Sequence, residues 1–174
     1  WSQDSLSELL KVAIWTTTPW TIPSNVAVSI SDRLEYSFVE DQQGRIFIIA
    51  TDLVPAVSEK IGQLFINRAK VKGSLLSGLL YKHPLVERVS PIVVGGDYIT
   101  TDSGTGLVHM APGHGVDDFN TARKNDLPVF CSVDEGGVLT SDAGQFAGLN
   151  VLKDANEVIT QALKERDALL KQEQ

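Results

Sequence analysis

The 174-residue chain has few of the residues that build covalent or metal frameworks: one cysteine, one methionine and three histidines. Because Cys131 is alone, the sequence excludes a disulfide framework and a cluster of cysteine metal ligands, and it favours a reducing compartment. No apolar run approaches the roughly 18–20 residues that a membrane-spanning helix requires. The chain begins at Trp1 and carries no basic-then-apolar leader. We therefore expect a piece excised from a longer protein, with no membrane partner.

Positive charge is also scarce, with 15 Lys and Arg against 22 Asp and Glu and a formal net charge of −7. Nucleic acids attract proteins through clustered basic side chains. A nucleic-acid partner would therefore be gripped at a few local positions or delivered by another part of a larger protein. The hydrophobic share of 43% and the charged share of 21% are those of an ordinary globular protein, and the length predicts one domain over residues 1–174.

Short alternating segments predict many strands, at residues 11–17, 26–30, 36–40, 45–50, 69–76, 79–81, 90–94, 107–108, 129–133 and 138–140. Helices are predicted at 118–124, at 153–172 and after a cap at Thr51 or Asp52, where an apolar stripe reaches Phe65. His83, before Pro84, is expected to hold a turn. This pattern predicts an α+β or mostly β fold, with a compact β-barrel-like core and peripheral helices.

Residues 16–25 have the sequence Thr-Thr-Thr-Pro-Trp-Thr-Ile-Pro-Ser-Asn. Pro19 and Pro23 each remove a backbone donor and fix a dihedral angle, which predicts a rigid, irregular stretch between strands. Two of the threonines are accounted for by β propensity and local turn bonding. Four hydroxyls within six residues would also form a polar wall for a ligand.

The segment Gly104–Phe119 is the densest in candidate site residues, with four glycines, two histidines and the chain's only methionine. Glycine lacks a Cβ and permits sharp bends and the close approach of a ligand. Asp117 and Asp118 stand where a helix can begin, and one acidic residue there is an ordinary cap. Two histidines, His109 and His114, in the same short segment as two aspartates predict that it lines a site.

A metal centre is the first chemistry to weigh, because His109, His114 and either Asp117 or Asp118 are metal-ligand types. Pro112 and its flanking glycine forbid a regular helix between the two histidines, so the paired arrangement of the zinc proteases is excluded. We expect no metal here.

Two further chemistries remain. Nucleophilic catalysis would need Cys131, which lies in an apolar strand context where cysteine is usually buried and inert. The other chemistry is hydrolysis without a protein nucleophile or a metal. Threonine hydroxyls and backbone amides would position water and the carbonyl oxygen, while Asp118 anchors a substrate ammonium group. The residues favour this last chemistry.

Two stretches resemble the editing domain of isoleucyl-tRNA synthetases. Residues 14–25, Ile-Trp-Thr-Thr-Thr-Pro-Trp-Thr-Ile-Pro-Ser-Asn, closely resemble its threonine-rich motif, and residues 101–119 resemble its second motif. Valyl and leucyl relatives typically carry arginine where this chain has Thr18, and an acidic residue where it has Trp20. Segments 81–85 and 134–137 also resemble the family, so the similarity spans nearly all of the chain.

The resemblance implies an insertion in a class I synthetase that removes valine wrongly attached to isoleucine tRNA, with valyl-adenylate as a further candidate substrate. It also implies roles for ten residues: Thr16, Thr17 and Thr18 at the reacting end and its water, Thr21 and Asn25 at the 3′-terminal adenosine, Asp118 on the α-ammonium group, His109 near the substrate side chain, and Met110, His114 and Asp117 elsewhere in the substrate site.

The implied partners are the 3′ end of isoleucine tRNA carrying valine and the rest of the synthetase in cis. No cofactor is expected for the editing domain, because ATP is used by the parent synthetase outside this piece. The implied compartment is the cytoplasm, with an organelle as the alternative. The alternative is a non-catalytic module that binds an aminoacyl group or a nucleic acid.

Overall fold

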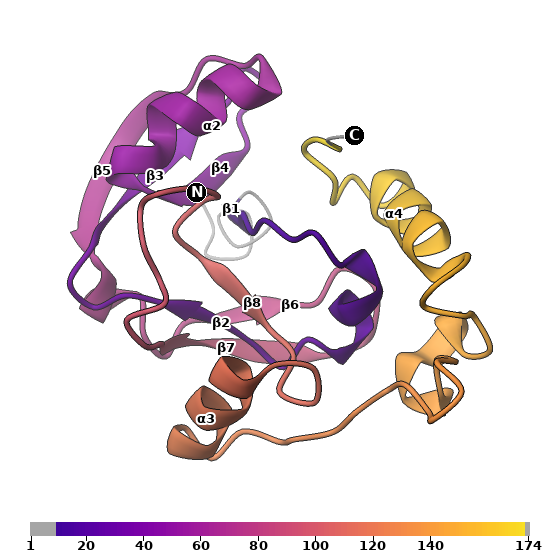
Figure 1. The fold of residues 1–174 in the computed structure, drawn as a ribbon. Coiled ribbons are helices and arrows are strands. Elements are labelled where there is room, and N and C mark those ends of the chain that lie inside the picture. The colour runs from indigo at the N-terminus through magenta and orange to yellow at the C-terminus, as the bar shows by residue number, and fades with distance from the viewer. Residues whose placement is uncertain (1–9, 173–174) are drawn as a thin grey trace. The chain divides into compact units, whose positions relative to one another are not determined.

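A computed structural model describes residues 10–172, and their strands form two four-stranded sheets (Figure 1). One sheet has the order β1-β4-β3-β5 and the other β6-β7-β2-β8. The strands are β1 (Leu10–Val12), β2 (Ala27–Ile30), β3 (Glu35–Glu40), β4 (Ile46–Ala50), β5 (Ile66–Lys72), β6 (Leu80–Lys82), β7 (Val89–Val94) and β8 (Val108–Met110).

The helical elements of the described residues comprise three α-helices and four short 3₁₀-helices. They are η1 (Pro19–Ser24), η2 (Thr51–Leu53), α2 (Val54–Ile61), η3 (Gly73–Leu75), α3 (Val116–Lys124), η4 (Ser141–Phe146) and α4 (Ala155–Glu165). The α+β class predicted from the sequence is confirmed. The barrel-like core is not found within residues 10–172, because each sheet keeps two edge strands instead of closing on itself.

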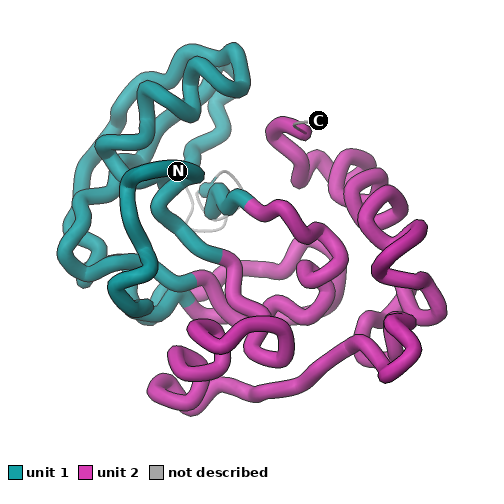
Figure 2. Tube along the Cα trace, viewed as in Figure 1, with its two compact units in different colours: residues 1–15, 29–79, 92–108 teal, residues 16–28, 80–91, 109–174 magenta. Residues whose placement is uncertain are grey.

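The chain divides into two compact units, each assembled from three separate stretches (Figure 2). Within the described residues, the first unit comprises 10–15, 29–79 and 92–108, and the second comprises 16–28, 80–91 and 109–172. None of the described helices is both long and apolar enough to span a lipid bilayer.

The first unit contains the predicted hairpin, in which β3 and β4 pair antiparallel from Tyr36 opposite Ala50 to Glu40 opposite Ile46. Its turn is held by Asp41, whose Oδ1 accepts hydrogen bonds from the backbone amides of Gln43 and Arg45 at 2.8 and 2.9 Å. Burial in the hairpin does not alternate: the last four residues of β4 are all buried, as are Tyr36, Ser37 and Val39 of β3, so side chains on both faces of the hairpin are covered.

Two predicted elements of the first unit are shorter in the structure. The first strand ends at Val12 and does not continue to residue 17. The helix α2 ends at Ile61 because Gly62 adopts a left-handed conformation with φ of 69°. Leu64, predicted to extend the buried stripe, is therefore outside the helix and 74% exposed.

The second unit has its own apolar core, which packs η1 against η4 and α4. Its buried members are Ile22, Leu85, Leu139, Ala143, Phe146, Ala155, Ile159 and Leu163. The backbone amide of Trp20 donates to Oδ1 of Asn156 at 3.0 Å, which ties η1 to the first turn of α4. This core holds the proline-rich segment rigid even though it has no regular strand.

Three local predictions in the second unit fare differently. His83 holds a turn as expected, since its Nδ1 accepts from the amides of Leu85 and Val86 at 3.0 and 3.1 Å. The strand predicted at 129–133 is absent apart from a bridge at Val133, so Cys131 is exposed and its predicted burial is wrong. The last helix ends at Glu165, not at residue 172.

Candidate functional site

Every site residue expected from the sequence lies in the second unit. The set comprises Thr16, Thr17, Thr18, Thr21, Asn25, His109, Met110, His114, Asp117 and Asp118. They come from the segment around η1 and from the segment that runs from β8 into α3.

His109 lies at the centre of a hydrogen-bonded chain. Its Nε2 is 2.8 Å from Oγ1 of Thr21, and its Nδ1 is 3.0 Å from Nδ2 of Asn25. Thr21 Oγ1 also donates to the backbone carbonyl of Thr18 at 2.9 Å. The hydroxyl of Tyr81 donates to Oδ1 of Asn25 and completes the chain at its other end.

The partners of Asn25 determine which ring nitrogen of His109 carries the proton. Asn25 Nδ2 donates to the carbonyl of Ala27 at 2.8 Å, so the amide nitrogen faces this side. An amide nitrogen is only a donor, so His109 Nδ1 must accept and be unprotonated. The proton is therefore on Nε2, which donates to Thr21 while Thr21 donates to Thr18.

Burial lowers the pKa of His109 to about 4, with electrostatic repulsion from His83 and His114 as smaller causes. The imidazole is therefore neutral at pH 7, in agreement with the hydrogen bonds, which use one nitrogen as donor and one as acceptor. Because both ring nitrogens of His109 are hydrogen-bonded to Thr21 and Asn25, the ring offers a ligand only its carbon atoms.

Tyr81 and Arg88 belong to this network although no role was assigned to them from the sequence. Arg88 Nη1 donates to the backbone carbonyls of Pro23 at 3.2 Å and Asn25 at 2.5 Å, which holds the end of η1. Tyr81 lies in a segment, 81–85, that resembles the family, so the sequence did contain a signal for it. Arg88 had no such signal.

The first three threonines form a short polar stretch before η1. The backbone amide of Thr18 donates to Oγ1 of Thr16 at 3.0 Å, and the Oγ1 atoms of the two residues are 3.4 Å apart. Thr17 and Thr18 are exposed. Their hydroxyls are therefore accessible to a ligand, while the prolines and the core beneath η1 keep the backbone in place.

Asp118 lies in the first turn of α3, and its Oδ2 accepts a hydrogen bond from the amide of Ala111 at 2.9 Å. Burial raises the pKa of Asp118 above its ordinary value; the Ala111 bond opposes this shift and the charge of Asp117 adds to it. Asp117 is exposed and makes no side-chain cap, because Gly115 is the N-cap residue. The acidic cap that the sequence offered for this helix is therefore not found.

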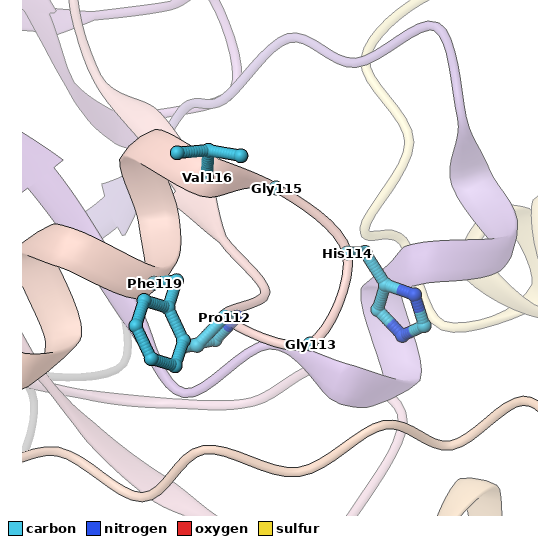
Figure 3. Close-up of a pocket in the computed structure, with 6 residues that line it drawn as sticks. All are labelled: Pro112, Gly113, His114, Gly115, Val116 and Phe119. Carbon is cyan, nitrogen blue, oxygen red and sulfur yellow. The ribbon is translucent and has the colours of Figure 1, made fainter.

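A shallow cavity of about 370 Å³ lies along the loop from Pro112 into α3 (Figure 3). Val116 and Phe119 on α3 are 77% and 44% exposed and form its apolar side. The ring of His114 points away from them, its Nε2 is 3.1 Å from Oγ of Ser24, and its ring meets that of Trp20 edge-on at 5.0 Å. This loop is therefore anchored to η1 through His114.

Met110 is positioned less favourably for contact with a ligand. The side chain of Met110 is completely buried, and its carbonyl accepts from the amide of Val26 at 3.0 Å. Among residues 10–172, no three His, Cys, Asp or Glu side chains are placed to hold a metal ion together. The role of Met110 in substrate binding stays a prediction.

Comparison with known proteins gives a consistent family. The family model described as "Leucyl-tRNA synthetase, editing domain" matches residues 6–164. An isoleucine–tRNA ligase from Prochlorococcus marinus (strain MIT 9313) is 61% identical over 168 residues, which cover 97% of this chain and 17% of the relative. One from Parasynechococcus marenigrum (strain WH8102) is 60% identical over 170 residues, 98% of this chain and 18% of the relative.

Solved structures show the same fold at low sequence identity. The crystal structure of GlLeuRS-CP1 has a TM-score of 0.77 at 15% identity and covers 98% of this chain and 89% of that chain. The Plasmodium knowlesi cytosolic leucyl-tRNA synthetase editing domain has a TM-score of 0.70 at 10% identity, with 94% and 85% covered. The present chain spans about 18% of the length of the curated ligases that it matches.

Proposed function

The chain belongs to the editing-domain family of class I aminoacyl-tRNA synthetases, and from this premise we propose that it hydrolyses valine wrongly esterified to isoleucine tRNA. Its similarity to isoleucine–tRNA ligases over nearly its whole length supports isoleucine tRNA as the carrier. The rest of the ligase supplies most of the tRNA affinity, because this segment has a net charge of −7 and no large basic field.

Such an activity is needed because binding energy alone separates isoleucine from valine poorly. One methylene in an apolar pocket is worth only about 1–3 kcal/mol, a general value for which isoleucyl-tRNA synthetase is itself the worked case. A synthetic site built for isoleucine therefore rejects valine poorly. A second pocket can admit valine, which has the smaller side chain, and exclude isoleucine by size.

In the proposed reaction a water molecule attacks the ester carbonyl, and the bond to the ribose oxygen breaks. The proton from water passes to that oxygen, which releases valine and free tRNA. Thr16, Thr17 and Thr18 orient the water and the carbonyl oxygen through hydroxyls and backbone amides. Asp118 holds the α-ammonium group, because a half-buried carboxylate is a strong partner for a cation.

The observation that carries the proposal is the state of His109. Both of its nitrogens are bonded within the chain, so the ring is neutral and held on two sides. A fixed, uncharged ring that offers only carbon atoms suits contact with an aliphatic side chain. We assign it as the wall that accepts valine and blocks the extra methylene of isoleucine.

The test follows free valine released from valyl-tRNA(Ile), with the sequence studied both as the 174-residue chain and within its ligase. Hydrolysis by the wild type, and not by a variant with Thr16, Thr17 and Thr18 all replaced by alanine, supports the proposal. Valyl-adenylate offered in parallel shows whether the same site cleaves it. Binding of valyl-tRNA without release of valine would favour the alternative, a non-catalytic aminoacyl-binding module.

A further inference from the structure

We propose that Tyr81 is a positioning residue for His109: acting through Asn25 together with the Ala27 carbonyl, its hydroxyl stabilises the ring tautomer and orientation on which discrimination between valine and isoleucine depends. Its link to specificity rests on the proposed function, whereas its link to the tautomer does not. Tyr81 is the middle residue of β6 and pairs with Ser90 of β7, so its backbone is set by the sheet. Its hydroxyl donates to Oδ1 of Asn25.

Asn25 can relay this contact because all the polar groups of its amide are used. Nδ2 donates to Ala27 O at 2.8 Å and to His109 Nδ1 at 3.0 Å, and Oδ1 accepts from Tyr81. The residue is only 5% exposed, so water cannot readily replace a missing partner. A rotated amide would place Oδ1 against the Ala27 carbonyl, where two acceptors repel, and would also take Oδ1 away from the Tyr81 hydroxyl.

The hydrogen bonds beyond the imidazole run in one direction, from His109 to Thr21 and from Thr21 to Thr18. His109 Nδ1 accepts, so Nε2 carries the proton and donates to Thr21, and Thr21 donates to the carbonyl of Thr18. The chain thus joins a strand residue to the threonine segment through one ring. If the hydroxyl of Tyr81 is removed, Asn25 Oδ1 loses its donor, and the Ala27 carbonyl alone still favours this orientation of the amide. The preference of His109 for an unprotonated Nδ1 is then weaker, because one of the two contacts that orient Asn25 is lost.

A purely space-filling role for Tyr81 is the competing account, and Tyr81→Phe separates the two because it keeps the ring and removes only the hydroxyl. Ring nitrogen chemical shifts of ¹⁵N-histidine report the tautomer directly. The chain has three histidines, and their signals are assigned by His83→Gln and His114→Gln variants of the 174-residue chain.

In the wild type we expect an unprotonated Nδ1 and a protonated Nε2 for His109. In Tyr81→Phe both shifts should move toward the average of the two tautomers. His83 is an internal control in the same spectra, because backbone groups of Ile22, Leu85 and Val86 bond its ring and do not depend on Tyr81. A protonated Nδ1 in the wild type would overturn the inference even if the variant did not fold. Unchanged His109 shifts in a folded Tyr81→Phe variant would also overturn it.

The kinetic arm uses the ligase that contains the sequence, with isoleucyl- and valyl-tRNA(Ile) as substrates. Tyr81→Phe should raise the ratio of isoleucine to valine release about tenfold, the order expected for one unpaired buried acceptor. Tyr98→Phe is the matched control, because that hydroxyl donates to Ser29 in the first unit and its loss should leave the ratio unchanged.

The two proposals fail differently. If the wild-type ligase releases no valine, the proposed function fails, and the nitrogen shifts still decide whether Tyr81 sets the tautomer. If valine is released but Tyr81→Phe slows both substrates equally with unchanged His109 shifts, Tyr81 has only a structural role.

Discussion

The backbone amide of Ala111 donates a 2.9 Å hydrogen bond to Oδ2 of Asp118, seven positions further along the chain. This bond ties the start of the loop between β8 and α3 to the first turn of α3. It leaves the carboxylate half-buried in a fixed place, where water solvates its negative charge less than it solvates an exposed carboxylate. An ammonium group that reaches this carboxylate would gain a charge-assisted contact that Asp117, exposed beside it, cannot match.

Asp118→Asn should reduce valine release about 100-fold, because an amide keeps the size of the side chain but loses the charge that attracts an ammonium group. The rate constant for deacylation of valyl-tRNA(Ile) is the measurement. Asp117→Asn is the matched control and should have little effect, since Asp117 is exposed in the same helical turn. Equal falls in the deacylation rate of the two variants would show that the total negative charge of the first helical turn matters and not the position of Asp118.

Single alanine substitutions of Thr16, Thr17 or Thr18 should each slow hydrolysis modestly, by about tenfold or less, because neighbouring hydroxyls and amides still hold water. The triple variant should lose nearly all activity at almost unchanged thermal stability, since two of the three residues are exposed. Deacylation rates and thermal unfolding of the four variants give the comparison. Complete loss in one single variant would point to a threonine that acts as a nucleophile.

His109→Ala should allow hydrolysis of isoleucyl-tRNA(Ile), because removal of the ring opens space for one more methylene. The quantity to compare is the ratio of isoleucine to valine release in the wild-type and variant ligases. We expect the ratio to rise about tenfold or more, the discrimination that one methylene provides. A fall in both rates at a constant ratio would mean that His109 supports the loop and does not exclude isoleucine.

The lowered pKa of His109 predicts a loss of stability in acid. The unfolded chain takes up a proton on this histidine near pH 6.5, whereas the folded chain does so only near pH 4. The free energy of unfolding should therefore fall as the pH drops from about 6.5 to 4, by up to about 3 kcal/mol from this group. Chemical denaturation at several pH values should show a shallower fall for His109→Gln. Parallel curves for the two proteins would contradict the assignment of a buried, neutral imidazole.

Local features of the fold could be predicted because their causes are local. Asp41 and the residues after it set the turn of the β3–β4 hairpin, and Pro19 and Pro23 keep the threonine segment out of a strand. Glycine at position 115 and the acidic residues after it start α3 within two positions of the predicted start. The motifs around Thr16 and Asp118 were enough to identify the family, because each is a long run of specific residues.

Elements that need a partner elsewhere in the chain could not be predicted in this way. Residues 129–133 have the composition of a strand, but only Val133 forms a β-bridge, with Leu139, and Cys131 is exposed to solvent. Two apolar segments predicted to extend helices, around Leu64 and at 166–172, lie outside them because Gly62 and Arg166 end α2 and α4. Strand pairing and helix ends depend on contacts that hydrophobic pattern alone does not specify.

The sequence by itself determined that a threonine-rich segment and a histidine- and aspartate-containing segment are the candidate site, since these residues stand in two continuous motifs. Only the tertiary structure decided what each side chain does there. His109 meets partners 88 and 84 positions away in Thr21 and Asn25, and Asn25 meets Tyr81 56 positions further on. Those contacts make the imidazole neutral and select its tautomer, because the direction of a hydrogen bond follows from the groups that folding brings together.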